Sequence, residues 1–127
     1  MSLILVVDDD FPNRYLLRVY LRHLGFESVE AENGKIAISQ FIEHRPQLIL
    51  MDIEMPVLNG REATKRIKEI EPRVPIIAVS GLPKKADITP FDYYIEKPYR
   101  LLKIEDVLVD FGFYSSEAMK GSSDASN

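Results

Sequence analysis

The chain has 127 residues, which fits one domain of ordinary size and leaves no room for a second. It contains no cysteine, so disulfides, thiolate zinc sites and thiol nucleophiles are excluded. Its 46% hydrophobic and 28% charged residues are typical of a soluble globular protein. A formal net charge of −4 argues against direct nucleic-acid binding, which needs a concentrated basic face.

The first apolar run, Leu3–Val7, is followed directly by three carboxylates, Asp8, Asp9 and Asp10. Five apolar residues without polar alternation are typical of a strand buried on both faces. The run is too short for a signal peptide or a membrane-spanning helix, so we expect a cytoplasmic chain with no membrane partner. Asp10 precedes Phe11-Pro12 and is predicted to cap the helix that this pair opens.

Predicted helices and strands then alternate along the chain. The apolar spacing predicts helices with buried stripes, which are Leu16, Leu17, Tyr20, Leu21 and Leu24, then Ala37, Ile38, Phe41 and Ile42, then Ala63, Ile67 and Ile70, and finally Ile104, Val107, Leu108 and Phe111. Further strands are predicted over 27–31, 48–52, 75–79 and 93–95. This alternation predicts an α/β protein with a flavodoxin-like, doubly wound, five-stranded parallel sheet in the order 2-1-3-4-5.

Four of the five predicted strands end in residues that can do chemistry: Asp8 and Asp9, Asp52, Ser80 and Lys97. Because the carboxyl ends of parallel strands meet at one edge of a sheet, we expect these side chains to converge. Each has an ordinary alternative, since Asp52 or Ser80 could cap a helix and Lys97 could be a surface lysine. It is the set as a whole that favours a functional site.

This set has a chemical logic. Three converging carboxylates repel one another unless a cation offsets their charge, and oxygen ligands without histidine or cysteine suit Mg²⁺. A carboxylate such as Asp52 can attack phosphorus and form an aspartyl-phosphate. Such a transfer depends on positioning and on neutralising the phosphoryl oxygens, for which Lys97 and the Ser80 hydroxyl are suited.

Four stretches together resemble the receiver domain of response regulators in two-component phosphorelay systems, and in particular single receivers of the chemotaxis type. They are Ile4–Asp10, Leu48–Gly60, Ile77–Gly81 and Tyr94–Pro98. The resemblance covers about residues 3–111. It implies the same sheet order, so the order predicted above is not independent of the family resemblance. We expect a receiver domain over residues 1–119 and a disordered tail over 120–127.

The resemblance implies a role for each acidic residue. Asp52 would be the phosphoacceptor and, with Asp8 and Asp9, would form the Mg²⁺ site. Asp9 would bind the ion directly and Asp8 through water, while the backbone carbonyl of Glu54 would be a further ligand.

The resemblance also implies a switch. Ser80 would be the switch hydroxyl, Tyr94 the aromatic switch residue, and Lys97 the phosphoryl-binding lysine, joined to Pro98 by a cis peptide bond. Ser80 replaces the threonine that is commoner in the family, which removes a methyl group but keeps the hydroxyl donor.

The implied function is a phosphoryl-accepting signalling switch rather than a turnover enzyme. A histidine kinase or histidine phosphotransfer protein would donate the group to Asp52, the chain would catalyse its own phosphorylation and slow dephosphorylation, and an unknown downstream protein would read the result. The alternative is a Mg²⁺-dependent phosphohydrolase that forms an aspartyl-phosphate. Glu54 has the spacing of its general acid, but 127 residues leave no room for a cap, and Asp8 and Asp9 would have no role. An interaction module that has lost phosphorylation is disfavoured because the acceptor-site residues are all present.

The sequence departs from the family between the fourth and fifth strands. Residues 80–92 barely suffice for a crossover with a helix, and they contain Gly81, Pro83 and Pro90. We therefore predict that the fourth helix is reduced to a turn or lost. The surface there should be altered, with three tyrosines relatively uncovered: Tyr93, Tyr94 and Tyr99.

Overall fold

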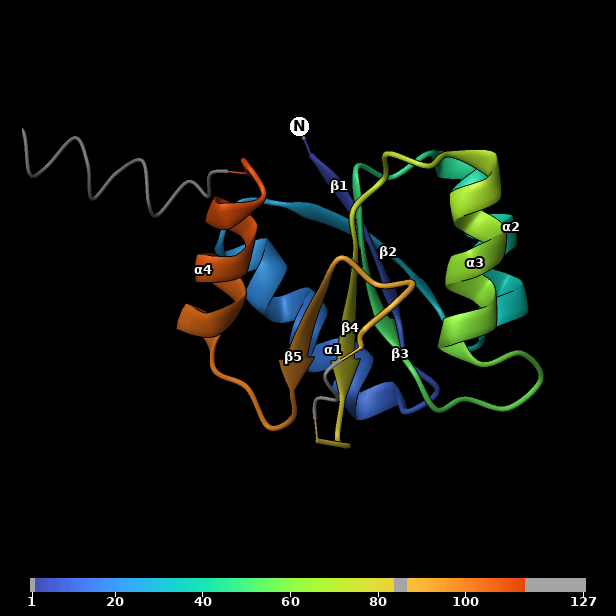
Figure 1. Cartoon of the computed structure of the whole chain (residues 1–127). Coiled ribbons are helices and arrows are strands. Elements are labelled where there is room, and N and C mark those ends of the chain that lie inside the picture. Colours follow the sequence, from blue (N-terminus) through green and yellow to red (C-terminus); the bar gives the residue numbers. More distant parts are fainter. Residues whose placement is uncertain (1, 84–86, 114–127) are drawn as a thin grey trace, which may run out of the picture.

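The computed structural model describes residues 2–83 and 87–113. Five parallel strands form one sheet in the order β2-β1-β3-β4-β5, which confirms the predicted fold class and strand order (Figure 1). The predicted tail, residues 120–127, lies outside the described residues. In chain order the elements are β1 (Leu3–Val7), α1 (Phe11–His23), β2 (Glu27–Ala31), α2 (Gly34–His44), β3 (Leu48–Asp52), α3 (Gly60–Ile70), β4 (Ile76–Ser80), β5 (Tyr93–Glu96) and α4 (Leu101–Asp110).

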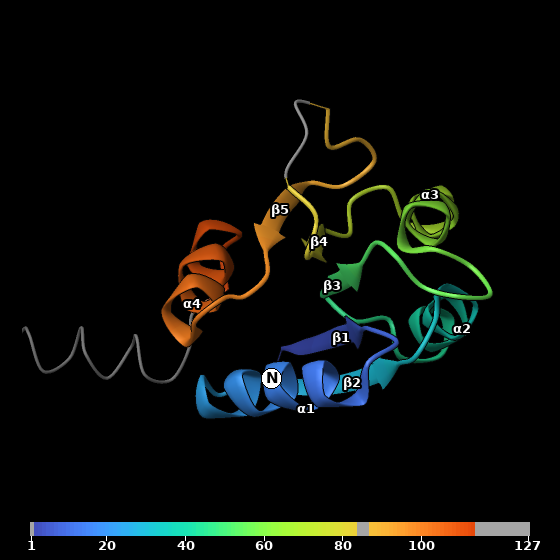
Figure 2. The ribbon, with the colours of Figure 1, turned by 90° about the horizontal axis from the view of Figure 1, so that it is seen from below.

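Helices lie on both faces of the sheet (Figure 2). Helices α1 and α4 pack on one face, with Leu17, Leu21 and Ile104 in that core, and α2 and α3 pack on the other, with Phe41 and Ile67. The central strands β3 and β4 are buried along their whole length, as expected for strands covered on both faces. In the described part of the chain no helix is long and apolar enough to span a bilayer.

Local sequence explains the first helix, with one correction. The Asp10 side chain accepts a hydrogen bond from the Asn13 backbone N–H at 3.3 Å, so Asp10 is the N-cap as predicted. The predicted buried stripe was too wide, because Leu16 is 42% exposed whereas Leu17 and Leu21 are buried. Successive helical residues lie about 100° apart, so only one of two adjacent leucines can face the sheet squarely. The same error affects Ile42, which is 52% exposed beside the buried Phe41. Ile70 is 40% exposed although it has the spacing of the buried face, and it is the last residue of α3.

The connection from β4 to β5 contains no helical turn in its described residues, 81–83 and 87–92, as predicted. Phe91 covers the sheet instead: it is 5% exposed and belongs to the core cluster on the α2 and α3 side. Arg61 of α3 holds this segment, because its guanidinium lies 5.5 Å from the centre of the Phe91 ring and donates to the Thr89 carbonyl.

The tyrosines beside this connection are less open than predicted. Tyr93, Tyr94 and Tyr99 are all partly buried, because they pack against the two core clusters. The Tyr94 hydroxyl also donates to the Leu82 carbonyl at 2.6 Å. The peptide bond between Lys97 and Pro98 is cis, as the family resemblance implied, and so is the Thr89–Pro90 bond, which was not predicted.

Candidate functional site

The carboxyl ends of β1 and β3 bring the three predicted carboxylates together. One oxygen from each of Asp8, Asp9 and Asp52 lies within 4.8 Å of the others. Asp8 and Asp52 are buried, whereas Asp9 is exposed, so the cluster opens to solvent on the Asp9 side. An oxygen-only donor set with an open side fits Mg²⁺, which keeps several waters and takes few carboxylates.

Lys97, at the end of β5, reaches across the sheet edge to this cluster. Its Nζ donates to Asp8 Oδ2 at 2.7 Å and lies 3.7 Å from Asp52 Oδ2. Burial alone lowers the pKa of Lys97, but the hydrogen bond to Asp8 and the charge of Asp52 outweigh this and raise that pKa above its usual value. The lysine is therefore a cation in the resting domain and offsets part of the negative charge.

The Asp52 carboxyl is difficult to ionise in the absence of a further cation. Burial of the group, followed by the negative charge of Asp8, raises the pKa of Asp52 from 3.8 to about 7, although Lys97 acts in the opposite direction. Near neutral pH the metal-free domain thus contains both protonated and ionised Asp52. A nucleophilic carboxylate here needs positive charge nearby.

This shift predicts a pH-dependent loss of stability without Mg²⁺. Unfolded Asp52 releases its proton near pH 3.8, but native Asp52 holds it to about pH 7, so native stability falls as the pH rises through this window and then levels off. The loss is at most about 4 kcal/mol. Urea unfolding in EDTA from pH 5 to 8 measures it, with Asp52→Asn as the comparison. The stability advantage of Asp52→Asn should grow across this range, and a constant difference would contradict the prediction.

Ser80 and Tyr94 meet at the segment that follows β4. Ser80 is 1% exposed, and its Oγ accepts the Leu82 N–H at 3.1 Å, which leaves the hydroxyl hydrogen available for another acceptor. Tyr94 bonds the carbonyl of the same residue, Leu82. Register places Val79 beside Asp52, so Ser80 follows one residue beyond the acceptor on the neighbouring strand. Glu54 is exposed, two residues past Asp52.

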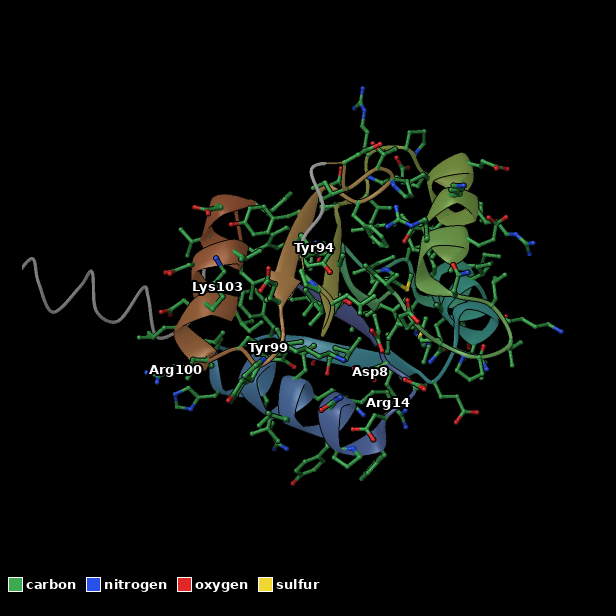
Figure 3. All side chains as sticks on the ribbon, turned by 60° about the horizontal axis from the view of Figure 1, so that its bottom comes forward. Asp8, Arg14, Tyr94, Tyr99, Arg100 and Lys103 are labelled. Carbon is green, nitrogen blue, oxygen red and sulfur yellow. The ribbon has the colours of Figure 1, made fainter. Side chains whose placement is uncertain are left out.

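Arg14, which lies beside the site, was not predicted from the sequence. The Arg14 guanidinium donates to the backbone carbonyl of Asp8 at 2.7 Å (Figure 3, where both residues are labelled). Every residue has a backbone carbonyl, so the sequence does not indicate which residue accepts such a hydrogen bond. An arginine inside a helix is also usually a surface residue. Its only sequence signal was its position one turn after the acidic run.

Comparison with known proteins gives a consistent result. Residues 4–108 match the family model of the response regulator receiver domain. The chain is 40% identical over 109 residues to the autoinducer 1 sensor kinase/phosphatase LuxN of Vibrio campbellii, covering 83% of this chain but 13% of that kinase. It is 38% identical over 112 residues to the chemotaxis protein CheY of Halobacterium salinarum, covering 84% of this chain and 93% of that protein.

Solved structures show the same likeness. The response regulator TrrA from Thermotoga maritima, in complex with Mg²⁺ and BeF, superposes with a TM-score of 0.81 at 30% identity, covering 87% of this chain and 98% of that one. The receiver domain of the sensor histidine kinase PA1611 from Pseudomonas aeruginosa, with a magnesium ion in its active-site cleft, gives 0.80 at 30% identity, covering 86% and 95%.

Proposed function

Because the chain belongs to the response regulator receiver family of two-component systems, we propose that Asp52 accepts a phosphoryl group and so switches the domain's protein contacts. Receiver domains are signalling switches and not turnover enzymes. The observation that carries the proposal is the buried Asp52 carboxylate, which lies between two further carboxylates and the Lys97 ammonium. Incubation with acetyl phosphate and Mg²⁺ tests it, because the intact mass should rise by one phosphoryl group, and should not rise in EDTA.

The chain's own residues account for the transfer. An Asp52 carboxylate oxygen attacks phosphorus, a new P–O bond forms, and the P–N bond of the donor phosphohistidine breaks to release imidazole. The Lys97 ammonium, already 3.7 Å from Asp52, binds a phosphoryl oxygen, and the Ser80 hydroxyl donates its hydrogen to another. Later, water attacks the same phosphorus, the P–O bond to Asp52 breaks, and inorganic phosphate leaves, which returns Asp52 to its resting carboxylate.

The donor set fits Mg²⁺, and four residues would hold it: Asp9 directly, Asp8 through water, Asp52 by its carboxylate and Glu54 by its backbone carbonyl. When bound, the ion supplies positive charge that favours ionised Asp52 and neutralises phosphoryl oxygens. Lys97 then neutralises the phosphoryl group from the side of β5.

The proposed partners follow from the comparisons. Two similar proteins are sensor kinases, LuxN and PA1611, so a histidine kinase or a histidine phosphotransfer protein is the proposed phosphoryl donor. The proposed output is contact with a downstream protein, with no direct contact to nucleic acid. The chain spans 13% of the length of LuxN, so the proposal does not extend to the activities of the whole kinase.

Removing Asp9 tests the Mg²⁺ ligand assignment. Mg²⁺ should raise the melting temperature of the unphosphorylated wild-type domain, because it binds the native state and relieves carboxylate repulsion. In Asp9→Ala this stabilisation should disappear, while the metal-free melting temperature should stay the same or rise. Thermal unfolding at a series of Mg²⁺ concentrations measures both. An undiminished Mg²⁺ effect in Asp9→Ala would show that Asp9 is not a ligand.

A further inference from the structure

Arg14 is almost entirely enclosed although it lies on a surface helix. Its side chain is 11% exposed, and its guanidinium lies 5.6 Å from the centre of the Phe11 ring. The Nε atom donates to Glu30 Oε1 at 2.7 Å, and Nη1 donates to the Asp8 carbonyl at 2.7 Å. A guanidinium that donates a hydrogen bond to a backbone carbonyl restrains the position of that part of the backbone.

The Arg14 guanidinium holds the acidic turn at one point, because it donates to the carbonyl of Asp8. The carbonyl of Asp10 accepts the backbone N–H of residue 14 at 3.1 Å, which is the ordinary helical bond and does not depend on the arginine side chain. Asp9, the proposed direct ligand of Mg²⁺, lies between these two carbonyls. The remaining backbone and side-chain groups of Asp8 are also engaged: its N–H donates to Ala31, Oδ1 accepts from Asp10, and Oδ2 accepts from Lys97.

Glu30 on β2 anchors this arginine. Its two carboxylate oxygens divide between Arg14 and Arg18, and the hydrogen bond from Arg14 is the largest cause that lowers the pKa of Glu30. Arg18 resembles Arg14 in this respect and also binds Ser28, through Nε to Oγ at 3.0 Å. In the described part of the chain the hydrogen bonds of the Arg18 side chain are with Ser28 and Glu30 of β2 and not with the acidic turn. One carboxylate offsets only part of the charge of two arginines, so the contribution of Arg14 that a lysine at this position would not reproduce is the geometry of its guanidinium contacts.

We propose that Arg14, anchored by Glu30, is a positioning residue that sets the backbone of residues 8–10 so that the Asp8 and Asp9 carboxylates are arranged for Mg²⁺ before the ion binds. This inference rests on the proposed function. Partners of metal ligands typically contribute about tenfold or more in metal affinity. Arg14 therefore governs how much Mg²⁺ the domain needs, and its side-chain hydrogen bonds are with Glu30 and Asp8 rather than with the phosphoryl-transfer residues Asp52, Lys97 and Ser80.

The test compares Arg14→Lys with Arg18→Lys, a matched control that replaces a similar guanidinium contact with Glu30 but removes no contact with the acidic turn. Calorimetric titration should show a Kd for Mg²⁺ raised about tenfold in Arg14→Lys and unchanged in Arg18→Lys. In labelling by acetyl phosphate, the Mg²⁺ concentration for half-maximal rate should rise by the same factor in Arg14→Lys. The maximal rate at saturating Mg²⁺ should change less than the Kd does, because the Arg14 side chain bonds Glu30 and Asp8 and not Asp52, Lys97 or Ser80.

Far-UV circular dichroism establishes that each variant is folded. If Arg14→Lys does not fold, Glu30→Gln serves instead, since it keeps the guanidinium but weakens its anchor, and a Kd raised severalfold is expected. Equal Kd values in Arg14→Lys and wild type, or equal increases in Arg14→Lys and Arg18→Lys, would overturn the inference alone. Failure of the wild-type domain to bind Mg²⁺ or to become labelled would overturn the proposed function as well.

Discussion

Asp52→Asn is expected to abolish phosphorylation by acetyl phosphate while leaving a folded domain. The amide keeps the shape of the carboxylate but has no ionised oxygen to attack phosphorus. Because Asp52 is buried and its charge is disfavoured there, the neutral residue should also raise the melting temperature in metal-free buffer near pH 8. Intact-mass measurement after incubation with Mg²⁺ and acetyl phosphate gives the stoichiometry, expected to be zero.

The matched control for this variant is Asp110→Asn, which removes an exposed carboxylate at the end of α4. It should be labelled like the wild type. If folded Asp52→Asn were labelled at the wild-type stoichiometry, Asp52 would not be the acceptor. Peptide mapping would then show whether Asp8 or Asp9 carries the phosphoryl group.

The strand ends could be predicted from the sequence because a parallel sheet converts a linear pattern into a spatial one. Unbroken apolar runs mark buried strands, and the residue after each run reaches the same edge. That rule alone predicts Asp8, Asp52 and Ser80 as neighbours, and the observed register places them so. The cis bond before Pro98 came only from the family resemblance.

Contacts made to backbone atoms were not predictable in this way. Arg14 binds the carbonyl of Asp8, and Arg61 binds that of Thr89, and neither acceptor depends on the identity of its side chain. The role of Phe91, which covers the sheet where a helix is missing, could not be predicted either. Prolines indicated correctly that no full helix forms in the described part of the connection, but a missing helix does not say which residue covers the sheet.

Gly60 shows how closely the acceptor strand is built against the next helix. It is the first residue of α3, after the Asn59 cap, and its N–H donates to the Ile53 carbonyl at 2.8 Å. A Cβ at this position would lie 1.8 Å from the Asp52 carbonyl oxygen and 2.9 Å from Met51 Cγ. The nearest atoms belong to the backbone of β3, so no side-chain rotation relieves the overlap.

Gly60→Ala should therefore destabilise the domain despite the higher helix propensity of alanine, which favours it by about 1 kcal/mol. The overlap forces α3 away from the end of β3, and we expect a net loss of about 3 kcal/mol or more in the free energy of unfolding.

Urea unfolding measures this loss, and the rate of labelling at Asp52 should fall in parallel because the acceptor's own carbonyl must move. The control is Gly81→Ala, where a Cβ meets no atom within 4 Å and the free energy of unfolding should stay within about 0.5 kcal/mol of wild type. If the two alanine variants had equal stabilities and labelling rates, the close approach of Gly60 to Asp52 would not constrain the acceptor.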